Sequence, residues 1–339
     1  MRSMFPSLDD SQKQVLRLIR KHATISGAEL ARLTNLQPST MVYILRKLHK
    51  MYLIEQAGTG TSTGKGGKKP TLWRLQSNQF HILGLEILPT RVRCVISDIT
   101  GNVVKQDSRK LHSKIDEESM TETVINVIKV QLSNYHASDI QILGAGIAVP
   151  GLVDSIVGTI LYSSSLKVCN YRLLNQLTDE FDFPVFLAND ANAASLTVPW
   201  YTSQTLDRTP QDFVYLLYTQ GAENLGSGLF INGELFQGFY GTAGEIFTPL
   251  PKLEVWLNEG LKSNIQPNKL VSDEFGQAEI SRLVEMAIGG CPLSSYVVRK
   301  LMSFIGDEII RIIGFINPEE VILGGELTKP QWLIETYLS

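Results

Sequence analysis

Apolar residues recur along this chain with two different periods, and the period changes near residue 50. Before that point they recur every three or four positions, which is typical of amphipathic helices. The pattern predicts helices over 11–21, 27–33 and 38–50. Ser26 is a plausible N-cap for the second helix, and Pro38 stands at the first turn of the third. The buried face of the third helix is expected to comprise Met41, Ile44, Leu45 and Leu48.

Two short apolar runs follow, over 51–55 and 70–75, and they predict strands. The segment between them, 58–69, contains only Gly, Ser, Thr and Lys and cannot form a core. Short helices, a tight turn and two strands make a winged helix-turn-helix, an α+β domain whose third helix reads DNA. We therefore expect a DNA-binding domain over 1–78, with a basic wing over 58–70.

From residue 79 the pattern becomes that of an α/β fold. Its first part has the order strand, strand, strand, helix, strand, which opens a ribonuclease-H-like domain; the ranges are 81–88, 91–99, 103–111, 117–132 and 140–149. The pattern restarts near residue 213, with strands over 214–218 and 228–232. Helical stretches that begin near 277 and 294 then lead to the segment 320–325. We expect a two-lobed, actin-like ATPase architecture over 79–339, with lobes of about 79–200 and 201–339 and a cleft between them.

A strand predicted over 183–187 is followed by an alanine-rich helix over 191–200. Asn189 and Asp190 therefore stand where a strand ends and a helix begins. In open α/β sheets, ligands bind at this carboxyl edge of the strands. A carboxylate at a helix N-terminus is also stabilised by unpaired backbone N–H groups. The spacing alone leaves both interpretations open, a ligand-binding pair and a simple helix cap.

The net charge is only −3, but its distribution divides the chain. Residues 1–75 hold 13 Lys and Arg against four Asp and Glu, whereas residues 76–339 hold 18 against 30. A basic module joined to an acidic one indicates that the first part meets a polyanion. The alternative is a three-helix protein-interaction domain with a linker. The predicted DNA contacts, on the third helix and the wing, are Ser39, Thr40, Tyr43, Arg46, Lys47, Lys65, Lys68 and Lys69.

Composition is that of an ordinary globular protein, with 43% hydrophobic and 19% charged residues among 339. No apolar run reaches membrane length, and the first twenty residues are amphipathic and charged, unlike a signal peptide. The three cysteines are far apart and form no CxxC pattern. A disulfide framework is therefore not expected, and the reducing cytoplasm fits best.

Six short motifs in order make the chain resemble the ROK family over nearly its whole length. The family comprises bacterial sugar kinases and, where a winged helix-turn-helix precedes the lobes, sugar-responsive transcriptional repressors. Each motif is weak alone, but the ordered set behind a DNA-binding head is specific. The motifs are Gly84-Leu-Glu86, Val149-Pro-Gly-Leu-Val-Asp154, Leu187-Ala-Asn-Asp-Ala-Asn192, Gly226-Ser-Gly228, Gly244-Glu-Ile246 and Leu323-Gly-Gly325.

The resemblance implies a sugar site. It makes Asn189 and Asp190 ligands of sugar hydroxyls, with Asp190 at the catalytic-base position of the kinases. It also implies that Gly151 lets the backbone approach the sugar and that Glu245 accepts further hydroxyl hydrogen bonds. Ser165 stands roughly where the family has an asparagine that contacts a hydroxyl, so the contact at this position differs.

Both phosphate-binding loops of the kinases are altered. The family's Asp-x-Gly-Gly-Thr corresponds here to Glu86-Ile-Leu-Pro-Thr90, in which proline also removes an N–H donor. Gly-Thr-Gly-Ile-Gly corresponds to Ala222-Glu-Asn-Leu-Gly226, which puts the Glu223 carboxylate where a phosphate oxygen would bind. We therefore expect a non-catalytic cleft that senses a sugar, with no sugar kinase activity and no cofactor.

Family members also follow Gly-Glu-x-Gly-His with a cysteine cluster that, together with that histidine, holds a structural zinc. Here Thr248 takes the histidine position, no histidine follows His136, and Cys291 stands alone. A structural zinc needs four nitrogen or sulfur ligands, so we expect no metal. Glu245 is then expected to be positioned by packing alone, with Phe247, Leu250 and Trp256 as the candidate neighbours.

Three functional interpretations stay open at this point. The first is a repressor that binds a double-stranded DNA operator under the control of a small sugar effector. The second is a glucokinase-like sugar kinase with a DNA-binding head, and the third a DNA-binding regulator whose lobes serve only dimerisation or protein partners. A homodimer or a dimer of dimers is expected, because helix-turn-helix proteins usually bind paired half-sites.

Overall fold

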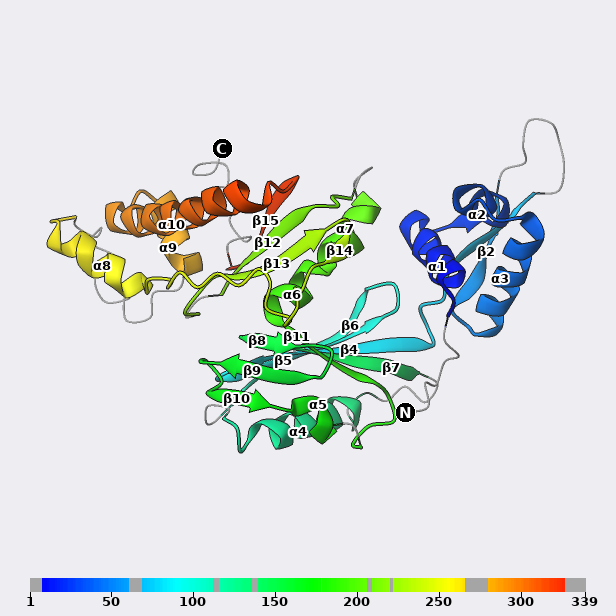
Figure 1. The fold of residues 1–339 in the computed structure, drawn as a ribbon, viewed down its shortest axis with the longest axis horizontal. Helices are drawn as coiled ribbons and strands as arrows, with labels where there is room; N and C mark the ends of the chain where they lie inside the picture. Colours follow the sequence, from blue (N-terminus) through cyan, green and yellow to red (C-terminus); the bar gives the residue numbers. More distant parts are fainter. Residues whose placement is uncertain are drawn as a thin grey trace. The chain divides into compact units, whose positions relative to one another are not determined.

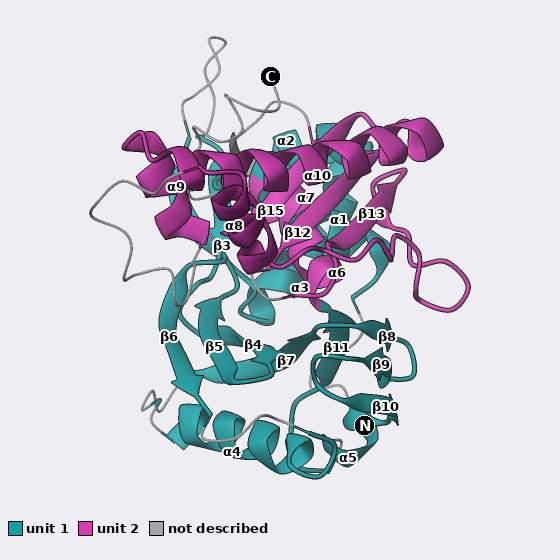
Figure 2. Ribbon diagram, turned by 90° about the vertical axis from the view of Figure 1, so that its left-hand side faces the viewer, with its two compact units in different colours: residues 1–189, 202–207 teal, residues 190–201, 208–339 magenta. Residues whose placement is uncertain are grey.

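A computed structural model describes residues 8–60, 69–111, 116–133, 135, 140–177, 179–205, 209–219, 222–265 and 280–326. The chain forms two compact units (Figure 2). The first comprises residues 1–189 and 202–207, and the second comprises residues 190–201 and 208–339.

The first unit begins with a winged helix-turn-helix (Figure 1). Its elements are α1 (Asp10–His22), β1 (Ile25–Ser26), α2 (Gly27–Thr34), α3 (Pro38–Lys50), β2 (Ile54–Thr59) and β3 (Thr71–Leu75). The strands form an antiparallel sheet in the order β1-β3-β2. Side-chain caps begin two helices, since Asp9 accepts from the Gln12 amide at 2.8 Å and Ser26 from the Glu29 amide at 3.2 Å.

The sequence-based helices of this head are confirmed, and α3 matches its predicted bounds. Met41, Ile44, Leu45 and Leu48 are buried, as their spacing predicts. The first wing strand begins later than expected, at Ile54. Residues 51–53 form a turn after α3, in which Tyr52 has φ +57° and the Leu53 amide donates to the Leu48 carbonyl at 3.1 Å.

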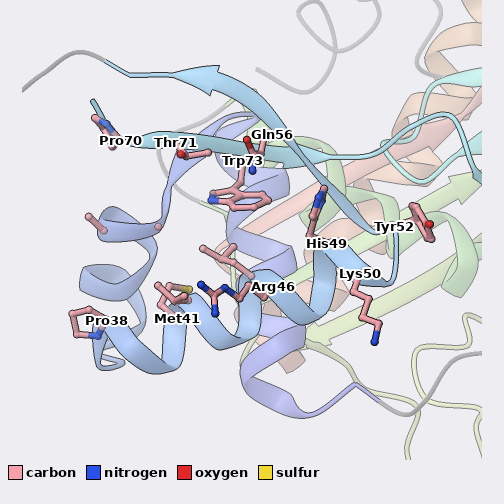
Figure 3. A pocket seen from close by; sticks show the side chains of 14 residues that line it. Pro38, Met41, Arg46, His49, Lys50, Tyr52, Gln56, Pro70, Thr71 and Trp73 are labelled. Atoms are coloured by element: carbon pink, nitrogen blue, oxygen red, sulfur yellow. The ribbon is translucent and has the colours of Figure 1, made fainter. Parts of the chain in front are cut away.

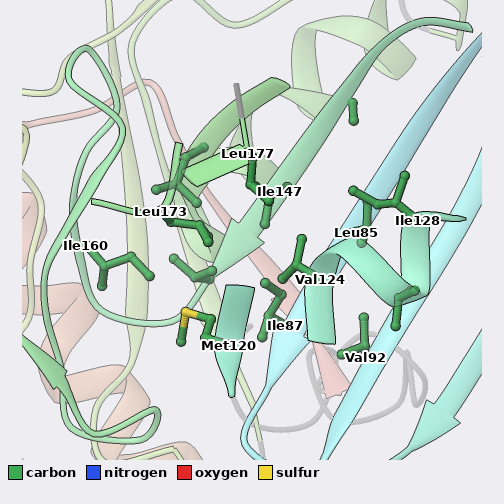
Figure 4. Close-up of a cluster of buried hydrophobic side chains, with 14 of the residues drawn as sticks. Leu85, Ile87, Val92, Met120, Val124, Ile128, Ile147, Ile160, Leu173 and Leu177 are labelled. Atoms are coloured by element: carbon green, nitrogen blue, oxygen red, sulfur yellow. The ribbon is translucent and has the colours of Figure 1, made fainter. Parts of the chain in front are cut away.

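A five-stranded sheet follows in the order β11-β7-β4-β5-β6. Its strands are β4 (Phe80–Leu88), β5 (Arg91–Asp98), β6 (Val103–Lys110), β7 (Gln141–Val149) and β11 (Val185–Asn189). β4, β7 and β11 run parallel, whereas β4, β5 and β6 form antiparallel hairpins. The core lies between this sheet, α4 (Met120–Ser133) and α5 (Leu173–Leu177), and it includes Ile87, Val124, Ile128 and Ile147 (Figure 4).

The sequence pattern missed a small sheet inserted between β7 and β11. It consists of β8 (Leu152–Asp154), β9 (Thr159–Ser163) and β10 (Val168–Tyr171), in the antiparallel order β10-β9-β8. Strands of three to five residues are too short to show a clear alternation, which is why the pattern did not reveal them. Ile160, Leu166 and Val168 of this segment join the core of the first unit.

The second unit contains a four-stranded sheet in the order β14-β13-β12-β15. Its strands are β12 (Phe213–Tyr218), β13 (Gly226–Ile231), β14 (Glu234–Leu235) and β15 (Glu320–Gly325). Alternate residues of β12 face opposite layers. Phe213 packs with Val198 of α7 (Thr197–Thr205), whereas Val214 and Leu216 pack in a cluster that includes residues of α10 (Pro292–Ile316).

Two features of this unit differ from the sequence-based expectation. The helix expected over 191–200 is divided into α6 (Asp190–Ser195) and α7. Residues 190–201 belong to the second unit, whereas the end of α7, residues 202–205, belongs to the first. Tight packing explains this assignment for α6, because added Cβ atoms on Gly226 and Gly228 of β13 would lie 2.9 Å from Ala191 and 2.5 Å from Ser195. The sequence analysis did not predict α8 (Leu253–Lys262), which packs with α9 (Ile280–Ile288) and α10.

Candidate functional site

The recognition helix α3 presents one polar face to solvent. Ser39, Thr40, Tyr43 and Arg46 are exposed, with 65% of Tyr43 accessible, while Lys47 is half-buried. The opposite face is buried in the head, so packing fixes which side chains project outward. Of the predicted DNA contacts on this helix, four therefore lie free to meet a groove, and Lys47 lies at the border of the exposed face.

An apolar groove of about 800 Å³ runs between α3 and the wing strands (Figure 3). Trp73 projects from β3 toward α3, where Met41 and Leu45 line the same groove. His49 makes an edge contact with Trp73, at 5.5 Å between ring centroids, and its Nδ1 lies 2.9 Å from the Ile54 carbonyl. Sequence reasoning missed the groove, because it depends on how α3 meets the wing.

The basic wing is only partly described. Lys65 and Lys68 lie outside the described residues, whereas Lys69 is exposed just before β3. The Gly60 amide donates to the Pro70 carbonyl at 2.8 Å and so closes the base of the wing. This hydrogen bond fixes the backbone of Pro70, which lines the groove, and Lys69 directly precedes it.

In the first unit, Gly151 and Asn189 are brought together at the ends of two parallel strands. The Asn189 side-chain amide donates to the Gly151 carbonyl at 2.9 Å, and Asn189 is 6% exposed. Gly151 has φ +111°, and an added Cβ would lie 2.3 Å from the Tyr162 carbonyl oxygen. Only glycine fits this backbone without a shift. The β7–β8 turn and β11 are thereby held in register at their carboxyl ends.

Ser165 lies in the turn between β9 and β10, close to the same place. Its hydroxyl oxygen is 3.3 Å from that of Ser163, which also accepts from the Leu166 amide at 3.3 Å. An added Cβ on Gly151 would lie 2.9 Å from the Ser163 Cα, so this turn borders Gly151. Three residues that the sequence predicts from distant stretches therefore lie close together at one end of the five-stranded sheet. They are Gly151, Ser165 and Asn189.

In the second unit, Asp190 and Glu245 form an electrostatically coupled pair. Asp190 is the first residue of α6, and its carboxylate accepts from the adjacent Ala191 amide at 2.8 Å. Burial, followed by the negative charge of Asp190, raises the pKa of Glu245 from 4.5 to about 7. A cap alone does not require a second carboxylate nearby. Asp190 and Glu245 both belong to the second unit.

The three residues expected to position Glu245 differ in their surroundings. Leu250 and Trp256 are buried in the helical core of the second unit, but Phe247 is 71% exposed, so the expectation for Phe247 is wrong. A hydrogen bond from the Ser227 hydroxyl of β13 to the Gly244 carbonyl holds the preceding residue. Gly244 has φ +89°, a conformation that glycine adopts without strain.

The two segments that correspond to the phosphate loops of the kinases are a two-residue hairpin turn and the loop between β12 and β13. Leu88 pairs directly with Arg91, so β4 and β5 are joined by the two-residue turn Pro89-Thr90. Glu86 at this end of β4 forms an ion pair with Arg93 at 2.8 Å. Between β12 and β13, Glu223 is exposed and its carbonyl accepts from the Leu250 amide at 2.7 Å.

The surroundings of Thr248 do not fit the zinc that the fold family implies. The Arg311 guanidinium donates to the Thr248 hydroxyl at 3.4 Å, and such a cation opposes a second positive charge. Cys291 is the N-cap residue of α10 and is buried. Within the described part of the chain, no three His, Cys, Asp or Glu side chains group as metal ligands would. The segment after Thr248 forms α8 instead of a cysteine-bearing loop.

Family comparisons agree with this arrangement. A model described as "Winged helix-turn-helix DNA-binding" matches residues 8–55, and the "ROK family" model matches residues 82–248. The chain carries a ROK family domain behind a winged helix-turn-helix. Within the described residues of this chain, no helix is both long and apolar enough to cross a membrane.

Curated proteins that this chain is similar to include repressors. A "Xylose repressor" of Caldicellulosiruptor bescii is 24% identical over 334 residues, covering 92% of this chain and 82% of the relative. The "DNA-binding transcriptional dual regulator NagC" of Escherichia coli is 22% identical over 333 residues, covering 93% of this chain and 80% of the relative.

Solved structures show the same fold. A ROK family transcriptional regulator, described as a homolog of the E. coli MLC protein, superposes with a TM-score of 0.74 at 22% identity, covering 96% of this chain and 86% of that one. A ROK family glucokinase from Streptomyces griseus, in complex with glucose and AMPPNP, gives 0.58 at 19% identity, covering 73% of this chain and 83% of that one. Regulators and kinases thus share the ROK fold, so the fold alone does not separate them.

Proposed function

We propose that this chain is a DNA-binding transcriptional regulator, a repressor, whose ROK domain binds a sugar and does not phosphorylate it. The observation that carries the proposal is the presence of two separate polar surfaces in one chain. One is the exposed face of α3, and the other is the pair of carboxylates of Asp190 and Glu245 in the second unit. A kinase needs no recognition helix, and a simple DNA-binding protein needs no half-buried pair of carboxylates.

The chemistry at the strand–helix junction suits a sugar. Carboxylates and amides match the dense donor and acceptor pattern of sugar hydroxyls. The Asn189 side-chain amide donates to the Gly151 carbonyl, which fixes the orientation of this side chain at the end of β11. A Glu245 pKa of about 7 lets this carboxyl group accept or donate a hydrogen bond near neutral pH.

The phosphate-side geometry supports binding without phosphoryl transfer. Phosphoryl transfer depends on backbone amides and a metal ion that neutralise the phosphate oxygens. The two-residue Pro89-Thr90 turn offers no glycine-rich cradle, and Glu86 is already paired with Arg93. The exposed Glu223 would add a negative charge on the second phosphate loop. We accordingly propose that the protein is not an enzyme and uses no cofactor.

We further propose that the regulator acts as a homodimer or a dimer of dimers. A single helix-turn-helix reads only a few base pairs, and paired half-sites supply most of the specificity of such proteins. A sugar can then control DNA binding by favouring one arrangement of two heads, to the extent that it binds the two arrangements with different affinity.

A thermal-shift screen of the full chain tests the proposal. Monosaccharides and their phosphates are compared, each with and without MgATP, and sugar-dependent ADP release is measured in parallel. We expect at least one sugar to raise the melting temperature, with no further change on adding ATP and no ADP release. Stabilisation by ATP with ADP release would identify a kinase, and the absence of any sugar response would favour lobes that serve only assembly.

A further inference from the structure

The carboxyl group of Glu245 sits on a segment without regular secondary structure. Residues 236–252, between β14 and α8, form neither helix nor strand. A side chain on such a loop can hold a fixed position only if contacts from rigid elements hold the loop. The loop makes such contacts with β13 on one side and with the layer that contains α10 on the other.

Three contacts hold the residues around Glu245. The Ser227 hydroxyl of β13 bonds to the Gly244 carbonyl, one residue before Glu245. Ile246, one residue after it, packs against the apolar cluster of Val214, Leu216 and Leu229 that α10 also covers. The third contact is the hydrogen bond that Arg311 of α10 donates to Thr248 at 3.4 Å.

Arg311 is itself fixed by a buried acid. The same Nη1 atom that reaches Thr248 lies 2.6 Å from the Glu308 carboxylate, whose side chain is only 6% exposed. A buried carboxylate is strongly disfavoured without its cationic partner, so Glu308 holds the guanidinium in place. The planar guanidinium can serve two acceptors at once, which a lysine ammonium on a flexible stem does less well.

We propose that Arg311 is the positioning residue of Glu245, fastening the loop 244–248 to α10 through Thr248. Thr248 takes the position at which the family has a zinc-binding histidine. In this chain the loop is therefore restrained by a hydrogen bond from the ion-paired Arg311, and not by a metal ion. The importance of this fastening for sugar binding rests on the proposed function. The fastening itself is a property of the chain without sugar and can be measured without it.

The test is the titration of the Glu245 carboxyl group in the full-length protein by carbon-13 NMR, with Glu245→Gln to assign its signal. Wild type should titrate near pH 7, because the held loop keeps the carboxyl group buried beside Asp190. In Arg311→Ala the loop should loosen and admit water, which lowers the midpoint by about one pH unit or more. Arg299→Ala, at an exposed arginine on the same helix, is the matched control and should leave the midpoint unchanged.

Two further variants separate positioning from helix stability. Thr248→Val keeps the Arg311–Glu308 pair and removes only the hydroxyl, so it should lower the Glu245 midpoint without a large loss of melting temperature. In the double variant Thr248→Val, Arg311→Ala, the Glu245 midpoint should be close to that of Thr248→Val alone, because both substitutions remove the same contact. Arg311→Lys should give an intermediate midpoint. If Arg311→Ala fails to fold, Thr248→Val decides the question.

The contrary outcome is equally clear. If Arg311→Ala lowers the melting temperature while Glu245 still titrates as in wild type, and Thr248→Val has no effect, then Arg311 serves only α10 and the proposal is wrong. A parallel titration of wild type with D-xylose, N-acetyl-D-glucosamine and D-glucose keeps the two proposals apart. Failure of every sugar to bind would count against the proposed function, whereas the Glu245 midpoints of the variants would still decide the role of Arg311.

Discussion

The recognition helix α3 and the Asn189–Asp190 junction present the two polar surfaces of this protein, and they are built in opposite ways. On α3 the exposed side chains lie on one continuous helix whose buried face fixes their direction. In the first unit, Gly151, Ser165 and Asn189 come from three separate turns and strand ends, and in the second unit Glu245 comes from an irregular loop. A surface on one helix should tolerate single changes locally, whereas a gathered site should fail when its scaffold moves.

The largest expected effect therefore concerns the scaffold of the gathered site. Gly151→Ala forces a Cβ to within 2.3 Å of the Tyr162 carbonyl oxygen at a φ of +111°. We expect a loss of about 2–4 kcal/mol in the free energy of unfolding, measured by urea denaturation. Gly146→Ala on β7 is the control, because nothing lies within 4 Å of its added Cβ. Equal stability of the two variants would contradict the strained-turn account.

Changes on α3 should instead weaken DNA binding and leave the fold intact. Arg46→Ala and Tyr43→Ala each remove an exposed side chain from the recognition face. We expect each to cost about 1–3 kcal/mol in DNA binding and to alter preference between operator sequences. Arg32→Ala removes the same charge from α2 and should have little effect. Competition binding with DNA selected from a random pool measures both the affinity and the sequence preference. A similar loss of affinity for Arg32→Ala would contradict the assignment of α3 as the helix that reads DNA.

The wing should contribute affinity without sequence preference. Replacing Lys65, Lys68 and Lys69 with alanine removes three positive charges that we expect to meet phosphates. Binding should weaken across all sequences, and the log–log dependence of affinity on salt should flatten by up to about 3. A triple alanine variant of Lys105, Arg109 and Lys110 on β6 is the charge-matched control. An unchanged salt slope in the wing variant would show that the wing does not contact DNA.

The smallest effect is a pH dependence of stability from the gathered site. The folded pKa of Glu245, about 7, is above its ordinary 4.5, so the folded state binds the extra proton between these values. Ionisation of Glu245 therefore lowers stability as pH rises from about 4.5 to 7, and the loss is complete above pH 7. Relative to Glu245→Gln, wild type should lose stability across this window. Parallel stability curves for the two proteins would show that Glu245 titrates normally.

The same contrast explains what could be predicted from the sequence. The bounds and buried face of α3 follow from a local period of 3.6 residues, so the sequence was enough. For α8 the sequence also carries a helical signal, since Leu253, Trp256 and Leu257 recur at helical spacing. The contact between Thr248 and Arg311 joins residues 63 positions apart, and no local pattern carries that information. The gathering of Gly151 and Asn189 became predictable only through ordered family motifs.

The most direct test of the account is operator binding against sugar concentration for wild type beside Asp190→Ala. Asp190→Ala removes an acceptor for sugar hydroxyls, at a cost of about 1–3 kcal/mol, while α3 is untouched. The variant should bind DNA normally without sugar and need about ten- to a hundredfold more sugar to respond. Wild type should release no ADP in the same mixture with ATP. Superimposable curves for the two proteins would contradict the claim that the Asn189–Asp190 junction senses a sugar.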